Sequence, residues 1–218
     1  MTNRRRSPGA PPAGVSPGED TSELAAAVAL AAGLVVAIPT DTVYGLAVDP
    51  RCGGATDALF RLKRRPATLE LPVLVAGVAQ AEALAGPHGL PSLARRLAGR
   101  FWPGPLTIVV ERRADVGWEL GGEGRTIGLR CPAHPVARRL CEVVGPLATT
   151  SANRHGQPPI TTSSALAAEF GRDVAVVVDG GLCDATPSTV IDVTGGTLRC
   201  IRDGAVPWNE VEEFVSSG

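Results

Sequence analysis

Residues 34–46, LVVAIPTDTVYGL, hold the decisive pattern of this sequence, an apolar run that ends in a cluster of hydroxyl groups. Residues 34–38 are apolar and partly β-branched, and Pro39 follows them, so the pattern predicts a short buried strand. Thr40, Asp41 and Thr42 then bring polar side chains to the end of that strand. Because ligands collect at strand ends in open α/β sheets, this stretch predicts both a sheet and a ligand site.

The rest of the chain alternates between helix and strand patterns. A helix is expected from Thr21 or Ser22 to Ala32, ended by Gly33. Further helices are expected at 55–64, 80–85, 92–100, 135–144, 164–170 and 207–215, and strands at 71–76, 106–110, 126–130, 147–149 and 175–178. Thr194, Gly195 and Gly196 separate strand patterns at 188–193 and 197–201, which predicts a hairpin. This order predicts an α/β fold with one sheet of mixed direction.

Composition indicates one globular domain with an N-terminal tail. The chain has 218 residues, and its 44% hydrophobic content suffices for a real core. Residues 1–20 are rich in Arg, Pro and Gly and predict a disordered tail, which leaves 21–218 as the folded domain. No signal peptide or membrane span is expected, so the predicted location is the cytoplasm. The five cysteines include no CxxC pair and are expected to be free thiols rather than zinc ligands.

Charge and motifs exclude several classes of protein. A net charge of −1 argues against a protein that holds nucleic acid mainly by charge. No P-loop, strand-linked GxGxxG, GxSxG elbow or HExxH motif is present. Lysine and arginine total 21, and Lys63 is the only lysine, which leaves 20 arginines. Since an ammonium is a compact point charge suited to phosphate oxygens, Lys63 is a candidate phosphate ligand.

Hydroxyl-rich and basic clusters follow the predicted strands in a fixed order. The segments are GLVVAIPTDTVYGLAVDP, LKRRP, LPVLV, FWPGPLT, TIGLRCPAHP, TTSAN with a following Gly, PSTVID and IRDGAV. Together they resemble the YrdC family over nearly the whole ordered chain. The chain ends soon after the last motif, so it is similar to the short, single-domain members.

The resemblance implies a twisted, open, mixed but largely parallel sheet with helices packed on it, around a central, positively lined cavity. It also implies an enzyme, a threonylcarbamoyl-AMP synthase. This activity converts L-threonine, bicarbonate and ATP to threonylcarbamoyl-AMP and pyrophosphate, with Mg²⁺ as the expected ion. The product then passes to a tRNA threonylcarbamoyl-transferase complex, and a weak contact with tRNA itself is compatible with this role.

The resemblance assigns a role to each matching residue. The implied catalytic residues are Lys63, Arg65, Ser151 and Asn153, and the implied ATP ligands are these four with Thr126 and Arg202. The implied threonine contacts are Thr40, Tyr44, Arg130, Thr149 and Ser188. Arg130 suits a carboxylate because a planar guanidinium can donate two bonds to it. No side chain is assigned to a metal, and no general base is evident.

Two departures from the family pattern affect the expected site. Leu69 and Glu70 stand where many members have Lys-Pro, which places a negative charge where a positive one is common. His155 and Pro159 follow the TTSAN segment, where members often have a serine.

Three alternatives remain open from the sequence. The first is a structured-RNA-binding module that uses the same basic cavity without catalysis. The second is an enzyme of the same fold that handles carbamoyl-adenylate in metal-centre maturation, although the additional domains usual in such chains are not found here. The third is a generic Rossmann oxidoreductase, which the missing glycine fingerprint disfavours.

Overall fold

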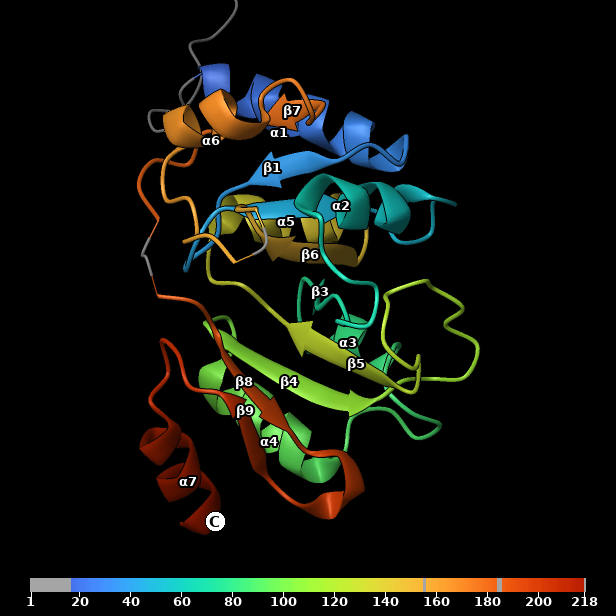
Figure 1. The fold of residues 1–218 in the computed structure, drawn as a ribbon. Helices are drawn as coiled ribbons and strands as arrows, with labels where there is room; N and C mark the ends of the chain where they lie inside the picture. The colour runs from blue at the N-terminus through green and yellow to red at the C-terminus, as the bar shows by residue number, and fades with distance from the viewer. Residues whose placement is uncertain (1–16, 155, 184–185, 218) are drawn as a thin grey trace, which may run out of the picture.

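The computed structural model describes residues 17–154, 156–183 and 186–217, in which nine strands form one sheet (Figure 1). The strand order is β7-β1-β2-β6-β3-β5-β4-β8-β9. The strands are β1 (Val36–Ile38), β2 (Gly45–Val48), β3 (Val73–Leu74), β4 (Leu106–Glu111), β5 (Thr126–Arg130), β6 (Leu147–Ser151), β7 (Val176–Val177), β8 (Thr189–Asp192) and β9 (Arg199–Arg202). We call β7, β1, β2 and β6 the first half of the sheet and the other five strands the second half.

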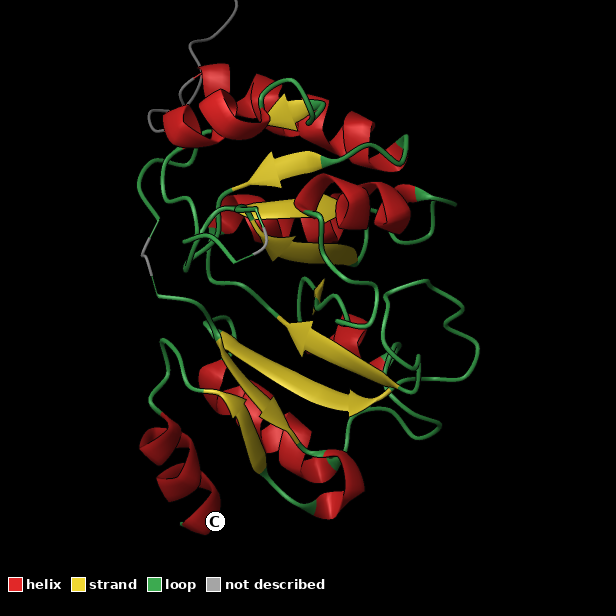
Figure 2. Ribbon diagram, viewed as in Figure 1, coloured by secondary structure: helices red, strands yellow, loops and turns green. Residues whose placement is uncertain are grey.

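Helices pack on both faces of the sheet (Figure 2). They are α1 (Pro17–Ala31), α2 (Ala55–Lys63), α3 (Val78–Glu82), α4 (Ser92–Phe101), α5 (Pro135–Val143), α6 (Ser163–Phe170) and α7 (Trp208–Ser216), with one 3-10 turn, η1 (Thr194–Gly196). The helices α1, α2, α5 and α6 surround the first half, whereas α3, α4 and α7 lie beside the second half. None of the helices in these ranges is both long and apolar enough to cross a bilayer.

Strand β1 is buried on both faces, which explains its continuous apolar sequence. Val36 and Ile38 belong to one buried apolar cluster, together with residues of α1 and α5. Ala37 belongs to the other, larger cluster, together with residues of α2 such as Leu59. Successive strand side chains point to opposite faces, so one short strand joins the two parts of the core.

The sheet is mixed, as predicted, but antiparallel pairs are more common than the expected largely parallel sheet implies. Three neighbouring pairs are parallel and five are antiparallel. Three of the antiparallel pairs join consecutive strands: β1 with β2, β4 with β5, and β8 with β9. A chain that reverses directly into the neighbouring strand pairs antiparallel, whereas parallel pairs need a longer crossover.

Most predicted elements are present within a few residues, including the hairpin of β8 and β9. Strand β2 is missing from the prediction because its first two residues, Gly45 and Leu46, were assigned to the hydroxyl cluster that follows β1. Helix α1 begins at Pro17, four residues before the expected start at Thr21. Of the predicted tail over residues 1–20, residues 1–16 lie outside the described residues, as does the departure at 155, and residues 17–20 belong to α1.

Candidate active site

A cavity of about 160 Å³ lies where the two halves of the sheet meet. Its lining is mainly hydroxyl, guanidinium and small apolar groups, and no carboxylate is among the lining residues that the structure describes. The lining residues are Thr40, Thr42, Val43, Gly45, Arg65, Pro72, Leu74, Thr107, Arg130, Thr149, Thr150, Ser151, Pro187, Ser188 and Arg202. The structure therefore brings seven predicted site residues to one cavity: Thr40, Arg65, Arg130, Thr149, Ser151, Ser188 and Arg202.

Arg130, at the end of β5, is buried and held from three directions. Its Nη2 donates to Asp41 Oδ1 at 2.8 Å, its Nη1 to Thr42 Oγ1 at 3.0 Å, and its Nε to the carbonyl of Gly104 at 3.1 Å. Asp41 Oδ1 also accepts from the backbone N–H of Ala133 at 3.0 Å. A guanidinium has five N–H donors, so two remain without a partner among the described contacts.

Hydroxyl groups of the turn between β1 and β2 form a chain beside Arg130. The Oγ1 atoms of Thr40 and Thr42 are 2.9 Å apart, and Thr40 Oγ1 donates to the carbonyl of Val43 at 2.6 Å. The same oxygen accepts from the backbone N–H groups of Thr42 and Val43. These bonds give both threonine side chains a single orientation at the cavity wall.

Helix α2 ends in a motif that separates Lys63 from Arg65. The N–H of Arg64 donates to the carbonyl of Arg61, and the N–H of Arg65 donates to the carbonyl of Phe60. This is the Schellman arrangement, in which the residue after the helix takes the left-handed conformation usual for glycine. Arg64 occupies that position with φ 53° and is the only residue other than glycine with positive φ in the described ranges.

Lys63 points inward, onto the loop that follows β6. Its Nζ donates to the carbonyl of Ser151 at 2.6 Å, to Ser151 Oγ at 2.8 Å and to Asn153 Oδ1 at 2.8 Å. All three acceptors are neutral, and the residue is only 3% exposed. Burial and then the charge of Arg65 lower the pKa of Lys63 to about 7. Lys63 and Asn153 therefore lie behind the cavity wall that Ser151 forms.

Four cations follow one another along the cavity. Burial is the main cause that lowers the pKa values of Arg65 and Arg202. The charge of Arg202 further lowers the pKa of Arg65, and the charge of Arg130 further lowers the pKa of Arg202. Together with the effect of Arg65 on Lys63, this links all four groups. Among the hydrogen bonds and ion pairs that join these four to described residues, only Asp41 supplies a negative charge. This excess of positive charge suits the cavity to anionic ligands.

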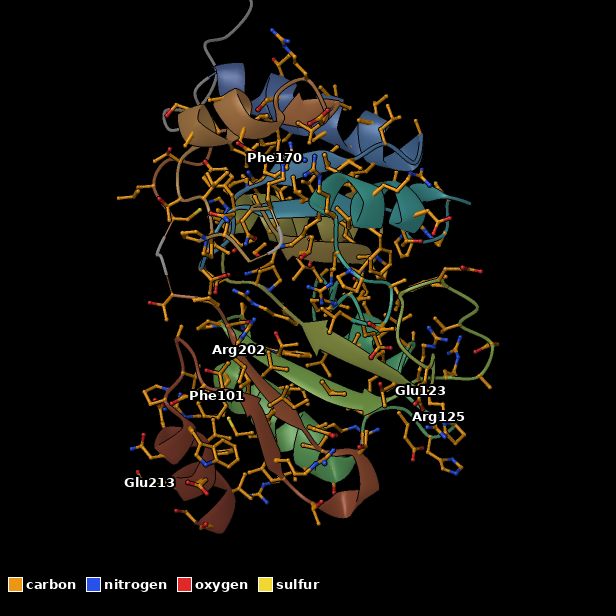
Figure 3. All side chains as sticks on the ribbon, viewed as in Figure 1. Phe101, Glu123, Arg125, Phe170, Arg202 and Glu213 are labelled. Carbon is orange, nitrogen blue, oxygen red and sulfur yellow. The ribbon has the colours of Figure 1, made fainter. Side chains whose placement is uncertain are left out.

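A second pair of hydroxyl groups lies in the other half of the sheet. Thr107 Oγ1 and Ser188 Oγ are 3.0 Å apart, and Arg202 Nη2 donates to Ser188 Oγ at 3.1 Å. Arg202 is the last residue of β9, at the side of the second half that faces the first (Figure 3). Thr107 and Ser188 are buried, so their positions are set by the packing of β4 against β8.

Two predicted ligand residues lie away from the cavity. Tyr44 is fully buried, and its hydroxyl donates to the carbonyl of Gly181 at 2.9 Å and accepts from the N–H of Gly180 at 3.0 Å. Thr126 Oγ1 donates to Glu70 Oε2 at 2.8 Å and lines a different depression. Neither side chain is among those that line the cavity.

Glu70 links Thr126 to the phosphate-binding candidates. Its backbone carbonyl accepts from Arg65 Nη2 at 3.1 Å, while its Oε1 is buried without a partner. Burial raises the pKa of Glu70, although the bond from Thr126 and the charge of Arg112 oppose this. The departure at Glu70 thus places a partly buried carboxyl on Thr126, while only the backbone of Glu70 contacts Arg65.

Sequence reasoning missed several residues that line the cavity or hold its lining side chains in place. Asp41 and Thr42 belong to the quoted opening cluster but were given no role. Thr107 was placed only in a strand, although a hydroxyl between Leu106 and Ile108 must face away from those two apolar side chains. Strand alternation was therefore the signal that could have found Thr107.

Residues 28–204 of this chain match the family model of the Sua5/YciO/YrdC proteins, and the description of that model is "Telomere recombination". The chain belongs to the Sua5/YciO/YrdC family. The threonylcarbamoyl-AMP synthase of Chromohalobacter salexigens is 37% identical over 177 residues, which cover 80% of this chain and 94% of that one.

Two solved structures of this family share the fold. Sua5 of Pyrococcus abyssi, in complex with L-threonine, superposes with a TM-score of 0.84 at 36% identity. That match covers 90% of this chain and 58% of Sua5, so the present chain spans little more than half of its length. YciO of E. coli superposes with a TM-score of 0.78 at 25% identity, over 87% of this chain and 92% of YciO.

Proposed function

We propose that this chain is a threonylcarbamoyl-AMP synthase that uses L-threonine, bicarbonate and ATP. The observation that carries the proposal is the cavity, in which a buried arginine with two unused N–H groups lies at one end of a row of four cations. Relatives named for this activity support it. They also disfavour the structured-RNA-binding alternative.

Arg130 is proposed to hold the carboxylate of threonine through its two unused N–H groups. A carboxylate and a guanidinium match in geometry and charge. Thr149 and Ser188 line the same cavity and are proposed to contact the rest of the amino acid. Tyr44, whose hydroxyl is engaged by Gly180 and Gly181, is proposed to act by shaping the site rather than by touching the ligand.

Lys63, Arg65 and Arg202 are proposed to hold the triphosphate of ATP, with Ser151 and Asn153 next to them. The phosphate oxygens would replace some of the neutral acceptors that now surround the Lys63 ammonium. An anion near Lys63 raises its pKa and keeps the ammonium charged. Thr126 is proposed to act on the nucleotide through Glu70 and Arg65.

Mg²⁺ fits this site as an ion bound to the triphosphate. Mg²⁺ in nucleotide sites is held largely by phosphates and water, which suits a cavity whose described lining residues include no carboxylate. Neutral oxygens such as Ser151 Oγ would complete its shell, and the ion would neutralise phosphate charge.

The reaction needs positioning and charge neutralisation more than a protein nucleophile. The threonine amine adds to the bicarbonate carbon with loss of water, and an oxygen of the resulting carbamate attacks the α-phosphate, which releases pyrophosphate. The neighbouring guanidinium groups lower the pKa of the bound amine, since like charges disfavour its protonated form. The row of cations then stabilises the departing pyrophosphate.

We further propose that residues 21–218 form the catalytic domain and that the product is passed to a transferase complex acting on a tRNA adenosine. The direct test is to incubate the protein with ATP, Mg²⁺, bicarbonate and L-threonine and to measure pyrophosphate. Release that depends on threonine is expected. Its absence from folded protein would overturn the proposal.

A further inference from the structure

We propose that Thr42 is a further substrate-binding residue, whose hydroxyl oxygen accepts an N–H from the amino group of the amino-acid substrate. The inference rests on the proposed function, because it assumes that an α-amino acid occupies the cavity. It concerns a residue for which the sequence suggested no role.

The hydrogen bonds around Thr42 determine where its proton points. A hydroxyl group has one proton to donate and two lone pairs. The Thr40 proton is used on the Val43 carbonyl at 2.6 Å, so we assign the proton of the contact between the two threonine hydroxyls to Thr42. At 2.9 Å this contact is shorter than the 3.2 Å and 3.3 Å contacts that Thr40 Oγ1 accepts from backbone N–H groups. A chain of donors therefore runs from Arg130 Nη1 to Thr42, from Thr42 to Thr40, and from Thr40 to the carbonyl of Val43.

This chain leaves Thr42 able only to accept from a ligand. Its proton is committed to Thr40, and one lone pair receives the Arg130 N–H. Thr42 lines the cavity and is 1% exposed, so bulk water does not compete for the remaining lone pair. A carboxylate or phosphate oxygen there would face the lone pair and be repelled, whereas an ammonium or amine group can donate to it.

The position of Thr42 also matches the shape of an α-amino acid. Its Oγ1 lies 3.0 Å from Arg130 Nη1, one of the nitrogens of the group proposed to bind the carboxylate. In an α-amino acid the carboxylate and the amine are attached to the same carbon, so the two groups fall on neighbouring partners. Asp41 holds the Arg130 guanidinium in this position, because its Oδ1 accepts from both Arg130 Nη2 and the backbone N–H of Ala133.

The test compares protein variants with ligand analogues in equilibrium binding without ATP. Thr42→Val keeps the shape and removes the oxygen, while Thr42→Ser keeps the oxygen. The ligands are L-threonine, (R)-3-hydroxybutanoate, which lacks the amine, and L-2-aminobutanoate, which lacks the hydroxyl. The weak ligands are measured by NMR titration or by displacement of threonine.

We expect Thr42→Val to weaken threonine and L-2-aminobutanoate about 10- to 100-fold, the usual effect of losing a hydrogen bond to a charged group. The same variant should change (R)-3-hydroxybutanoate far less, and Thr42→Ser should recover most of the affinity for threonine. Equal losses for all three ligands would mean that Thr42 acts only through Arg130. A loss that spares L-2-aminobutanoate would assign the oxygen to the substrate hydroxyl instead. Either result overturns the proposal.

The test separates this inference from the proposed function. Pyrophosphate release by the unmodified protein reports on the synthase activity, whereas the binding comparison does not involve ATP. Threonine-dependent pyrophosphate together with equal losses for all three ligands would sink only the Thr42 assignment. If the unmodified protein binds no threonine, the Thr42 assignment fails, and if it also releases no threonine-dependent pyrophosphate, the proposed function fails with it.

Discussion

The ammonium of Lys63 lies 2.8 Å from Asn153 Oδ1, among three neutral oxygens supplied by the last residue of β6 and the loop after it. Ser151 Oγ donates to the same Asn153 oxygen at 2.6 Å, so that oxygen serves two donors. A charged group in a neutral, buried cage is stabilised less than in water, which explains the low pKa of Lys63. The arrangement makes this lysine responsive to any anion that enters.

ATP binding should take up a proton through Lys63. At pH 8 the Lys63 amine is largely neutral because its pKa is about 7, and the negative charge of the triphosphate should raise that pKa. Calorimetry of MgATP binding in two buffers with different ionisation enthalpies measures the proton uptake. Lys63→Met is the matched control, because proton exchange by ATP itself contributes to both titrations and drops out of the difference. The same uptake by both proteins would contradict the assignment, as would undiminished turnover by Lys63→Ala.

Changes at Arg130 should affect threonine far more than ATP. Arg130→Lys keeps a charge beside Asp41 but loses the planar fork, so we expect the KM for threonine to rise about 10- to 100-fold. The KM for ATP should change by less than about threefold, since Arg130 is at the far end of the row of cations from Lys63. Steady-state kinetics in both substrates check this. A parallel rise of both constants would argue against a carboxylate role.

Arg64→Gly should stabilise the protein. Arg64 holds a left-handed conformation that glycine adopts without strain, and relief of about 1 kcal/mol corresponds to a Tm increase of roughly 2–4 °C for a chain of this size. Arg61→Gly is the control, because that residue lies within the last turn of α2 and glycine there should lower Tm by a similar amount. Thermal unfolding followed by circular dichroism measures both. Lower stability in both variants would contradict the argument.

Tyr44→Phe should lower stability. The variant keeps the buried ring but leaves the N–H of Gly180 and the carbonyl of Gly181 without their partner, which costs about 1–3 kcal/mol. Chemical denaturation measures this loss in the free energy of unfolding. If Tyr44 instead touches threonine directly, the affinity for threonine will fall sharply in Tyr44→Phe while the midpoint of unfolding stays where it was.

Glu70→Gln should stabilise the protein increasingly as the pH rises. Burial raises the pKa of Glu70 above its ordinary value of 4.5, so the folded state binds its proton more tightly than the unfolded state. The cost of ionising Glu70 is absent below about pH 4 and grows as the pH rises through the folded pKa. The difference in Tm between Glu70→Gln and the unmodified protein should therefore increase from pH 4 to pH 7. A difference that does not vary with pH would show that the carboxyl is not destabilised by burial.

The sequence alone determined most of the elements and the groups of residues that carry the chemistry. The strand at 126–130 and the helix at 92–100 follow from local patterns of apolar residues, because the strand and helix periods act over a few neighbours. The clusters at strand ends predicted a shared site, and seven of the predicted residues line one cavity. The short spacing of Lys63 and Arg65 also placed both at the C-terminal end of α2.

Only the tertiary structure decided which of these groups face the cavity and what holds them. The pairing of Asp41 with Arg130 joins residues 89 positions apart, and it depends on the order of strands in the sheet. The same order directs Tyr44 into the core and leaves Thr126 on Glu70. Local spacing does not specify such contacts, because they arise when distant buried polar groups find partners away from water. The inward position of Lys63 has the same origin.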